Sequence, residues 1–295
     1  MPQTPLAVAE AIISTFQTLP TIPVAAARAI QILNEPEPDL SEVADIILAD
    51  QVIAARVIRI INSPLYRLLH EIESVKQALV YLGPQKIFEI ILTACFLELT
   101  DNRQQGLRLQ SCWEHSFGVG LVARSLAELS GVARPEVAYV AGILHDIGEV
   151  ILSQQRPEQF RQALVLAGEQ ELDLFDAETQ VFGTSHSELG ALLAQQWHFP
   201  DQLVQVILHH HDKEIEQQPS LIQVVYLADH ICVDVRLKCD MDQSLREDAA
   251  GVYGANLHEL EHQLQRLGVK NLAAFRQALS QMIEKVKETV QSIYA

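Results

Sequence analysis

The chain has 295 residues, of which 48% are hydrophobic, so it is long enough to bury a substantial core. Its 38 acidic residues outnumber its 21 lysines and arginines and give a net charge of −17. A charge of this sign repels nucleic-acid backbones and anionic lipid surfaces, so we expect no nucleic-acid partner and no membrane partner.

The first third of the sequence predicts short helices separated by prolines. Apolar residues follow helical spacing from Val43 to Ile61, and Ser41 stands where a helix N-cap is expected. The turn at Asn62-Ser63-Pro64 ends this run. This third contains no group of histidines and carboxylates, so we expect residues 1–105 to form a small helical subdomain without chemistry of its own.

Longer helices are predicted in the middle of the chain. One ends at Gly131, a residue typical of helix C-caps, and the next begins at Pro135, which is favoured in a first turn. Ser185 and Glu188 have the spacing of a capping box, so His186 is expected in the first turn of its helix. Two more helices are predicted over DQLVQVILHHHD and SLIQVVYLADHICVDV.

The C-terminal segment, residues 239–295, predicts a helical extension of the preceding bundle, which we assign to residues 106–238. Its apolar stripe from Leu272 to Val290 is either an internal packing face or the contact of a homodimer, and the sequence leaves both open. Almost no segment alternates polar and apolar residues, as a half-buried strand would. The predicted fold class is therefore all-α.

No segment is predicted to enter or cross a membrane. The first basic residue is Arg28, so no basic region precedes the first apolar stretch as in a signal peptide. The longest apolar run, IFEIILTACFLEL, contains Glu89 and Glu98 and is shorter than the roughly 20 residues of a helix that spans a bilayer. We expect a cytoplasmic protein.

The adjacent pair His145-Asp146 lies in the otherwise apolar stretch VAYVAGILHDIGEVIL. Burying a polar group without a partner costs roughly 2–7 kcal/mol, and an unpaired carboxylate costs more, so something must compensate both side chains. The neighbouring predicted helices carry more histidines and a second aspartate, and the complete set is His115, His145, Asp146, His186, His210, His211 and Asp229.

Imidazole and carboxylate groups together suit iron, manganese or zinc, and helix bundles build metal centres from side chains on facing helices. The sequence therefore predicts a centre for one or two divalent ions. Each residue also has a plainer interpretation: His115 as a core histidine bonded to a carbonyl, His145-Asp146 as a structural pair, and the other histidines as solvated helix ends. The ordered spread of the set over successive helices favours the metal centre.

The order H…HD…H…HH…D resembles the ligand order of the HD superfamily of metal-dependent phosphohydrolases. From about Leu19 to Val235 the chain resembles one subfamily, the HDOD family, a helical output module of bacterial signalling. In the N-terminal half the resemblance is carried by LPTIPVAAARAIQIL, ADIILADQVIAARVIRIINSPLY and IESVKQALVYLGPQKI. In the C-terminal half it is carried by HSFGVGLVARSLA, AGILHDIGE, TSHSELGALLAQQWHFP and LVQVILHHHD.

The resemblance implies a small N-terminal helical subdomain packed on an HD-type helical bundle, and a module that acts by contact with a signalling protein partner. It also implies two metal positions, one formed by His115, His145, Asp146 and Asp229 and the other by His186, His210 and His211, with Asp146 as the bridge. In an active relative, His145 and Asp146 would be the candidate catalytic residues and the ligand would be a phosphate ester.

Two departures from the active relatives count against hydrolysis. Those relatives usually carry lysine three positions after the motif aspartate, where this chain has Glu149, and no Gly-Tyr-Pro segment follows His211. A carboxylate repels an anionic phosphate that a lysine would hold. We therefore expect a regulatory module that retains a divalent-metal site. The alternatives are an active phosphohydrolase acting on a nucleotide or another phosphate ester, and a metal-free scaffold in which His145 and Asp146 satisfy each other.

Overall fold

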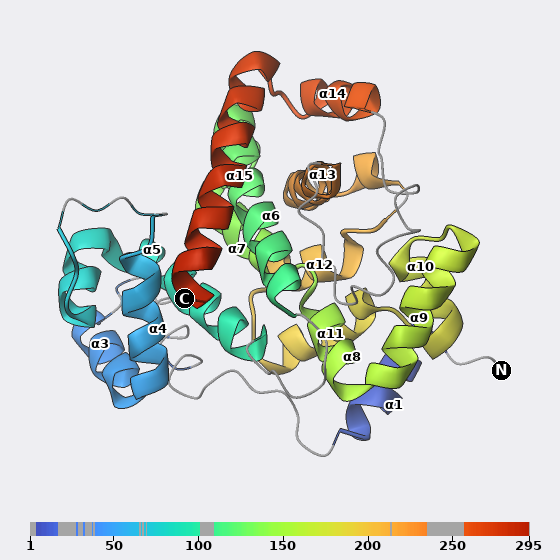
Figure 1. Cartoon of the computed structure of the whole chain (residues 1–295), viewed down its shortest axis with the longest axis horizontal. Coiled ribbons are helices and arrows are strands. Elements are labelled where there is room, and N and C mark those ends of the chain that lie inside the picture. The colour runs from blue at the N-terminus through green and yellow to red at the C-terminus, as the bar shows by residue number, and fades with distance from the viewer. Residues whose placement is uncertain are drawn as a thin grey trace. The chain divides into compact units, whose positions relative to one another are not determined.

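The computed structural model describes residues 4–16, 39–64, 70–100, 109–212, 214–234 and 257–294, together with residues 28, 32, 37, 66 and 68. Fourteen α-helices, one short 3-10 helix and no strand occur in these described residues, which confirms the all-α fold class (Figure 1). The chain divides into two compact units. The larger unit contains residues 1–20 and 100–275, and the smaller unit contains residues 21–99 and 276–295.

The predicted boundaries near residues 105 and 238 lie outside the described residues, and they stay predictions. The structure groups residues 1–20 with the larger unit and residues 276–295 with the smaller unit, whereas the sequence patterns suggested neither association.

Among its described residues, the smaller unit contains α3 (Leu40–Ala49), α4 (Gln51–Ile61), α5 (Val75–Thr100) up to residue 99, and α15 (Leu272–Tyr294) from Arg276 onward. Aspartates set the first helix boundaries. The side chain of Asp39 accepts hydrogen bonds from the Ser41 and Glu42 amides and caps α3, so the predicted cap at Ser41 is wrong by two residues. Asp50 caps α4 in the same way, because its side chain accepts hydrogen bonds from the Val52 and Ile53 amides, which are free at the start of the helix.

A backbone break divides α5. Gly83 has a φ of 79°, and Pro84 follows it, so the helical hydrogen bonds cannot continue through this point. Among the described helices, none by itself has the length and hydropathy of a membrane span. The two halves of α5, Val75–Pro84 and Lys86–Leu97, meet those criteria only as a pair bent by 118°.

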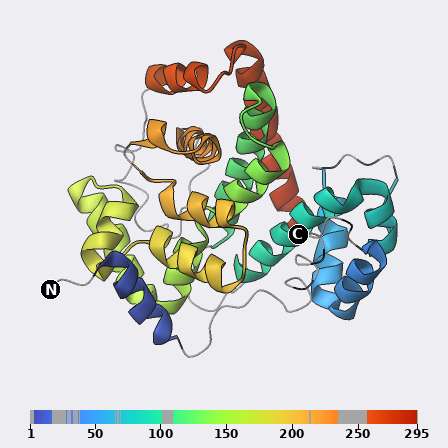
Figure 2. The same ribbon diagram turned by 180° about the vertical axis from the view of Figure 1, so that it is seen from behind.

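The larger unit begins with the first helix of the chain, α1 (Pro5–Ser14), which packs against α11 (His186–Gln196). In Figure 2, α1 is the blue helix beside the yellow and yellow-green helices of this unit. Ala9 and Ile13 are its buried residues. Further along the chain the unit contains α6 (Leu109–Ser130), α7 (Pro135–Leu144), α8 (Ile147–Gln155), α9 (Pro157–Gln170), α10 (Leu174–Phe182), α12 (Asp201–His209), the 3-10 helix Ile215–Gln217, α13 (Ser220–Asp234) and α14 (Leu257–Arg266).

Several predicted helix ends in this unit are confirmed. Gly131 follows the last residue of α6 with a φ of 71°, and its amide bonds to the Ala127 carbonyl. Pro135 is the first residue of α7. The capping box of Ser185 and Glu188 is formed, and it places His186 as the first residue of α11.

Glycine pairs allow the helices of the larger unit to approach closely. A Cβ atom at Gly142 of α7 would lie 2.7 Å from the Cα atom of Gly120 of α6. A Cβ atom at Gly148 of α8 would lie 2.8 Å from the Gly190 amide nitrogen of α11 and would collide with the His186 carbonyl oxygen. The link between α7 and α8 is therefore held between α6 and α11.

We predict that Gly148→Ala destabilises the protein by about 3 kcal/mol or more, because backbone atoms of α11 occupy the space that the new methyl group needs. Thermal unfolding measures the effect. Gly168→Ala is the matched control: this exposed glycine of α9 has no neighbour within 4 Å, so alanine should stabilise the helix by about 1 kcal/mol. A normal melting temperature for Gly148→Ala would contradict the close contact of α8 with α11.

Candidate metal centre

The structure brings all seven predicted side chains together in the larger unit. His145 and Asp146 form the two-residue link between α7 and α8, because the helix predicted through this motif breaks there. His186 begins α11, and His210 and His211 directly follow α12. The helices α6 and α13 supply the remaining two, His115 and Asp229.

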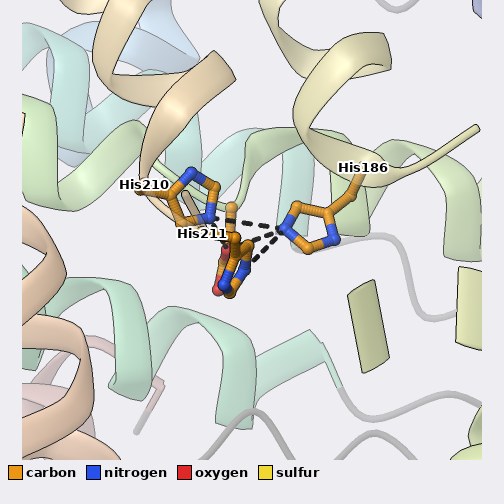
Figure 3. A group of neighbouring side chains, drawn as sticks. His186, His210 and His211 are labelled. Atoms are coloured by element: carbon orange, nitrogen blue, oxygen red, sulfur yellow. Dashed lines mark hydrogen bonds and ion pairs between the residues drawn. The ribbon is translucent and has the colours of Figure 1, made fainter. Parts of the chain in front are cut away.

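These side chains form two groups, and within each group the ligand atoms all lie within 4.8 Å of one another. The first group is His115, His145 and Asp229, and the second is Asp146, His186, His210 and His211. Figure 3 shows the three histidines of the second group: His186 points toward His210 and His211, which are neighbours in the chain. The sequence placed Asp146 in the first group as well, as a bridge.

The two oxygens of Asp146 face different groups. Its Oδ2 lies 3.4 Å from His115 Nε2 and 3.1 Å from His145 Nε2. Its Oδ1 lies 3.2 Å from His210 Nε2 and 3.6 Å from His186 Nε2. This is the arrangement that a bridging carboxylate requires. Asp229 faces the first group only, with its Oδ1 3.2 Å from His115 Nε2.

The Nδ1 atoms of His145 and His210 point away from the centre. His145 Nδ1 lies 2.8 Å from the Gly142 carbonyl oxygen, and His210 Nδ1 lies 2.9 Å from the Ile207 carbonyl oxygen. A carbonyl only accepts hydrogen bonds, so each Nδ1 carries the proton in the neutral ring. Each Nε2 then directs its lone pair into the centre, as in a metal-binding histidine whose other nitrogen is held by a hydrogen bond.

Pairs of these Nε2 atoms lie close to one another. The distance is 3.3 Å between His115 and His145, 3.4 Å between His186 and His210, and 3.1 Å between His186 and His211. Two nitrogens without protons repel at such distances, so each group requires a proton or a metal cation between its rings. Buried nitrogen and carboxylate donors without thiolate suit a divalent ion such as iron, manganese or zinc, so the residues fit the metal.

Ionisation in the centre reflects the competition between burial and the two aspartates. Burial disfavours the charged form of His115, but hydrogen bonds to Asp146 and Asp229 raise its pKa well above the usual value. Burial also opposes ionisation of Asp146, yet the charge of His145 and hydrogen bonds from histidines hold the pKa of Asp146 well below its usual value. The pKa of Asp229 is lowered in the same way, chiefly by its hydrogen bond with His115, against the effect of burial.

The histidines of the second group are not equivalent. Burial opposes charge on His186, but the nearby charge of Glu178 and a hydrogen bond to it raise the pKa of His186 to about 10. Burial lowers the pKa of His210, and burial with the neighbouring His210 and His186 lowers the pKa of His211. Each group therefore contains one histidine on which positive charge is favoured, His115 in the first and His186 in the second.

Three residues at the centre were not among the predicted ligands. Glu178 on α10 is fully buried and binds His186, and Phe175 lies one turn earlier, with its ring 5.3 Å from that of His211. These two residues lie three apart on one face of α10, and only the tertiary structure brings that face to the centre. Glu149 is buried on α8, and burial and the charge of Asp146 raise its pKa well above the usual value.

The centre is almost closed to solvent. Six of its seven side chains are buried, with exposed fractions from 0% for His145 and His210 to 8% for Asp146, and only His211 is half-buried. His209, the neighbour of two ligands, turns away and pairs with Asp212 at 3.0 Å.

Known proteins share this helical architecture. A family model described as the HDOD domain matches residues 19–213. The crystal structure of an HDOD domain protein of unknown function from Geobacter sulfurreducens is 31% identical, with a TM-score of 0.79 over 97% of this chain and 98% of that one. A structure described as a candidate phosphohydrolase, from Shewanella amazonensis, is 24% identical, with a TM-score of 0.75 over 97% of this chain and 98% of that one, and this likeness concerns the fold.

A curated, uncharacterized protein from Treponema pallidum is 25% identical over 227 residues, which are 75% of this chain. The match covers 43% of that relative, so the chain spans less than half of its length.

For the protein stripped of metal, we predict that His186 contributes stability that falls as the pH rises. Its pKa is higher in the folded chain than the ordinary value of about 6.5, so the contribution is complete below about pH 6.5 and is lost as the pH rises through about 10. The melting temperature of the wild type should therefore approach that of His186→Gln over this range, with chelator present. A constant difference would contradict a charged His186 in the metal-free fold.

Proposed function

This chain belongs to the HDOD family, and from that membership we propose that it is a regulatory module of bacterial signalling whose larger unit binds divalent metal. One observation carries the proposal: Nε2 atoms of four histidines surround both oxygens of the buried Asp146. The facing Nε2 atoms and the buried carboxylate call for a cation in each group, and a divalent ion would compensate both kinds of donor at once.

The proposed ligands divide as the two groups do. His115, His145 and Asp229 would hold one ion, while His186, His210 and His211 would hold the other, with Asp146 between them. A bound divalent ion supplies positive charge for buried carboxylates and lowers the pKa of a coordinated water. The chain's own contribution is to present the unprotonated Nε2 atoms of neutral His145 and His210 and to exclude solvent from six of the seven side chains.

A regulatory role is favoured because the ligands come from α6, the link between α7 and α8, α11, the end of α12, and α13. Metal binding at such a centre couples to folding, since the ligands are far apart in the unfolded chain. Occupancy would thus set the stability of the larger unit, and with it any surface that this unit offers to another protein.

The proposal includes a cytoplasmic location and a signalling protein as the partner, with no nucleic-acid or membrane partner. The net charge of −17 supports a basic or neutral protein surface as the contact. A homodimer through the C-terminal helix is the alternative assembly.

The second candidate function is a metal-dependent phosphohydrolase that acts on a nucleotide or another phosphate ester, with His145 and Asp146 as the catalytic residues. The complete set of seven ligand side chains supports it. Glu149 opposes it, because this buried side chain is repulsive as a carboxylate and offers no positive charge as a neutral acid. A phosphate bound beside it would lack the cation that a lysine provides.

We predict one or two equivalents of iron, manganese or zinc in the protein purified without chelator or a histidine tag, by elemental analysis. His210→Gln should lose metal, because it removes a ligand nitrogen at the centre. His209→Gln is the matched control from the same end of α12, since its ring pairs with Asp212 instead. Equal metal contents for the two variants, or none in the wild type after reconstitution, would contradict the proposed centre.

We also predict that the metal-loaded wild type hydrolyses a panel of nucleotides and other phosphate esters no faster than Asp146→Asn, because the centre is enclosed and lacks a phosphate-binding cation at Glu149. Phosphate release measures this. Hydrolysis by the wild type that Asp146→Asn abolishes would favour the second candidate function instead.

A further inference from the structure

We infer that Glu178 is the positioning residue of the second metal group: it fixes the ring of His186 and thereby sets the metal affinity of that group alone. The inference rests on the proposed metal centre. It concerns a residue on α10, a helix that contributes no ligand to either group.

Glu178 holds His186 at two points with a single oxygen. Glu178 Oε2 accepts a hydrogen bond of 2.8 Å from the His186 backbone amide and lies 2.7 Å from His186 Nδ1. The backbone amide is one of the free donors at the start of α11, which the helix itself cannot satisfy. The same carboxylate therefore caps the helix and orients the imidazole.

His186 needs this outside support because of its place in its helix. His145 and His210 follow the ends of α7 and α12, and each ring bonds to the carbonyl three residues earlier, which the helix supplies. His186 begins α11, so its own helix supplies no carbonyl before it. A side chain from another element must hold its Nδ1 if its Nε2 is to face Asp146.

The environment of Glu178 agrees with a role directed at a cationic centre. Its side chain has no exposed surface, and Glu178 Oε1 has no hydrogen-bond partner in the described structure. A buried carboxylate with one oxygen unpaired is costly unless positive charge lies nearby. Among the described residues, the hydrogen bonds of Glu178 go to His186, whose Nε2 faces Asp146 on the other side of the ring. A carboxylate also makes a ligand imidazole more basic than a carbonyl does, which strengthens its bond to a metal.

The effect is confined to the second group. Within the described residues, the hydrogen bonds of Glu178 go to His186, and the first group of His115, His145 and Asp229 receives none of them. Phe175 lies on the same face of α10, with its ring 6.2 Å from that of His186 and 5.3 Å from that of His211. This face of α10, formed by Phe175 and Glu178, therefore contacts the second group from outside.

The test is a titration of the full-length, metal-stripped chain with Mn²⁺ or Zn²⁺ by calorimetry, for the wild type and for Glu178→Gln. The amide keeps the size of the side chain but not its charge. We expect the variant to lose roughly 10–100-fold in affinity for one ion, with the other unchanged. Glu89→Gln is the matched control, because Glu89 is an equally buried glutamate in the smaller unit, paired with Lys86, and both ions should bind as in the wild type.

The outcomes separate this inference from the proposed function. No metal in the wild type overturns the proposed centre itself. If the wild type binds one ion or two and Glu178→Gln binds them equally well, only the positioning role is overturned. An equal loss of affinity at both groups overturns it too. If the glutamine variant does not fold, Glu178→Asp decides, since its shorter carboxylate keeps the charge but withdraws from His186. Selective weakening again supports the inference, and unchanged binding again overturns it.

Discussion

The structure of the larger unit depends on the environment of Asp146. This carboxylate lies between the Nε2 atoms of four histidines, each of its oxygens facing a different group. A buried anion and several inward lone pairs are tolerable together only if cations occupy the space between them. The ring orientations and the ionisation at the centre agree with that one electrostatic requirement.

The helices place these side chains around Asp146 by packing with their backbones unusually close. Glycines at the contact of α6 with α7 and of α8 with α11 remove the side chains that would separate these helices. The link that carries His145 and Asp146 is consequently pressed between His115 on one side and His186 on the other. Backbone carbonyls then hold the rings at helix ends, while Glu178 holds the one ring at a helix start. Stability and site geometry are thus products of the same contacts.

The proposed regulatory role agrees with a carboxylate, Glu149, at the position where active relatives usually carry lysine. A metal that joined the five segments would change the folding free energy of the unit when it bound or left, and a partner could respond to this change without any bond being cleaved. The near-complete burial of the centre fits such a role better than turnover of a bulky ester, for which a ligand must reach the ions.

The sequence alone determined the helical fold class, three helix ends of the larger unit and the seven side chains that the structure brings together, because helical periodicity, capping residues and the order of histidines and aspartates are local or linear signals. It did not determine that the motif helix breaks at His145-Asp146, that Asp39 rather than Ser41 caps α3, or that α1 packs on α11. Only the tertiary structure decided how Asp146 divides its oxygens and that Glu178 and Phe175 line the second group. Those features depend on distances between segments remote in the chain, and no spacing along the sequence encodes such distances.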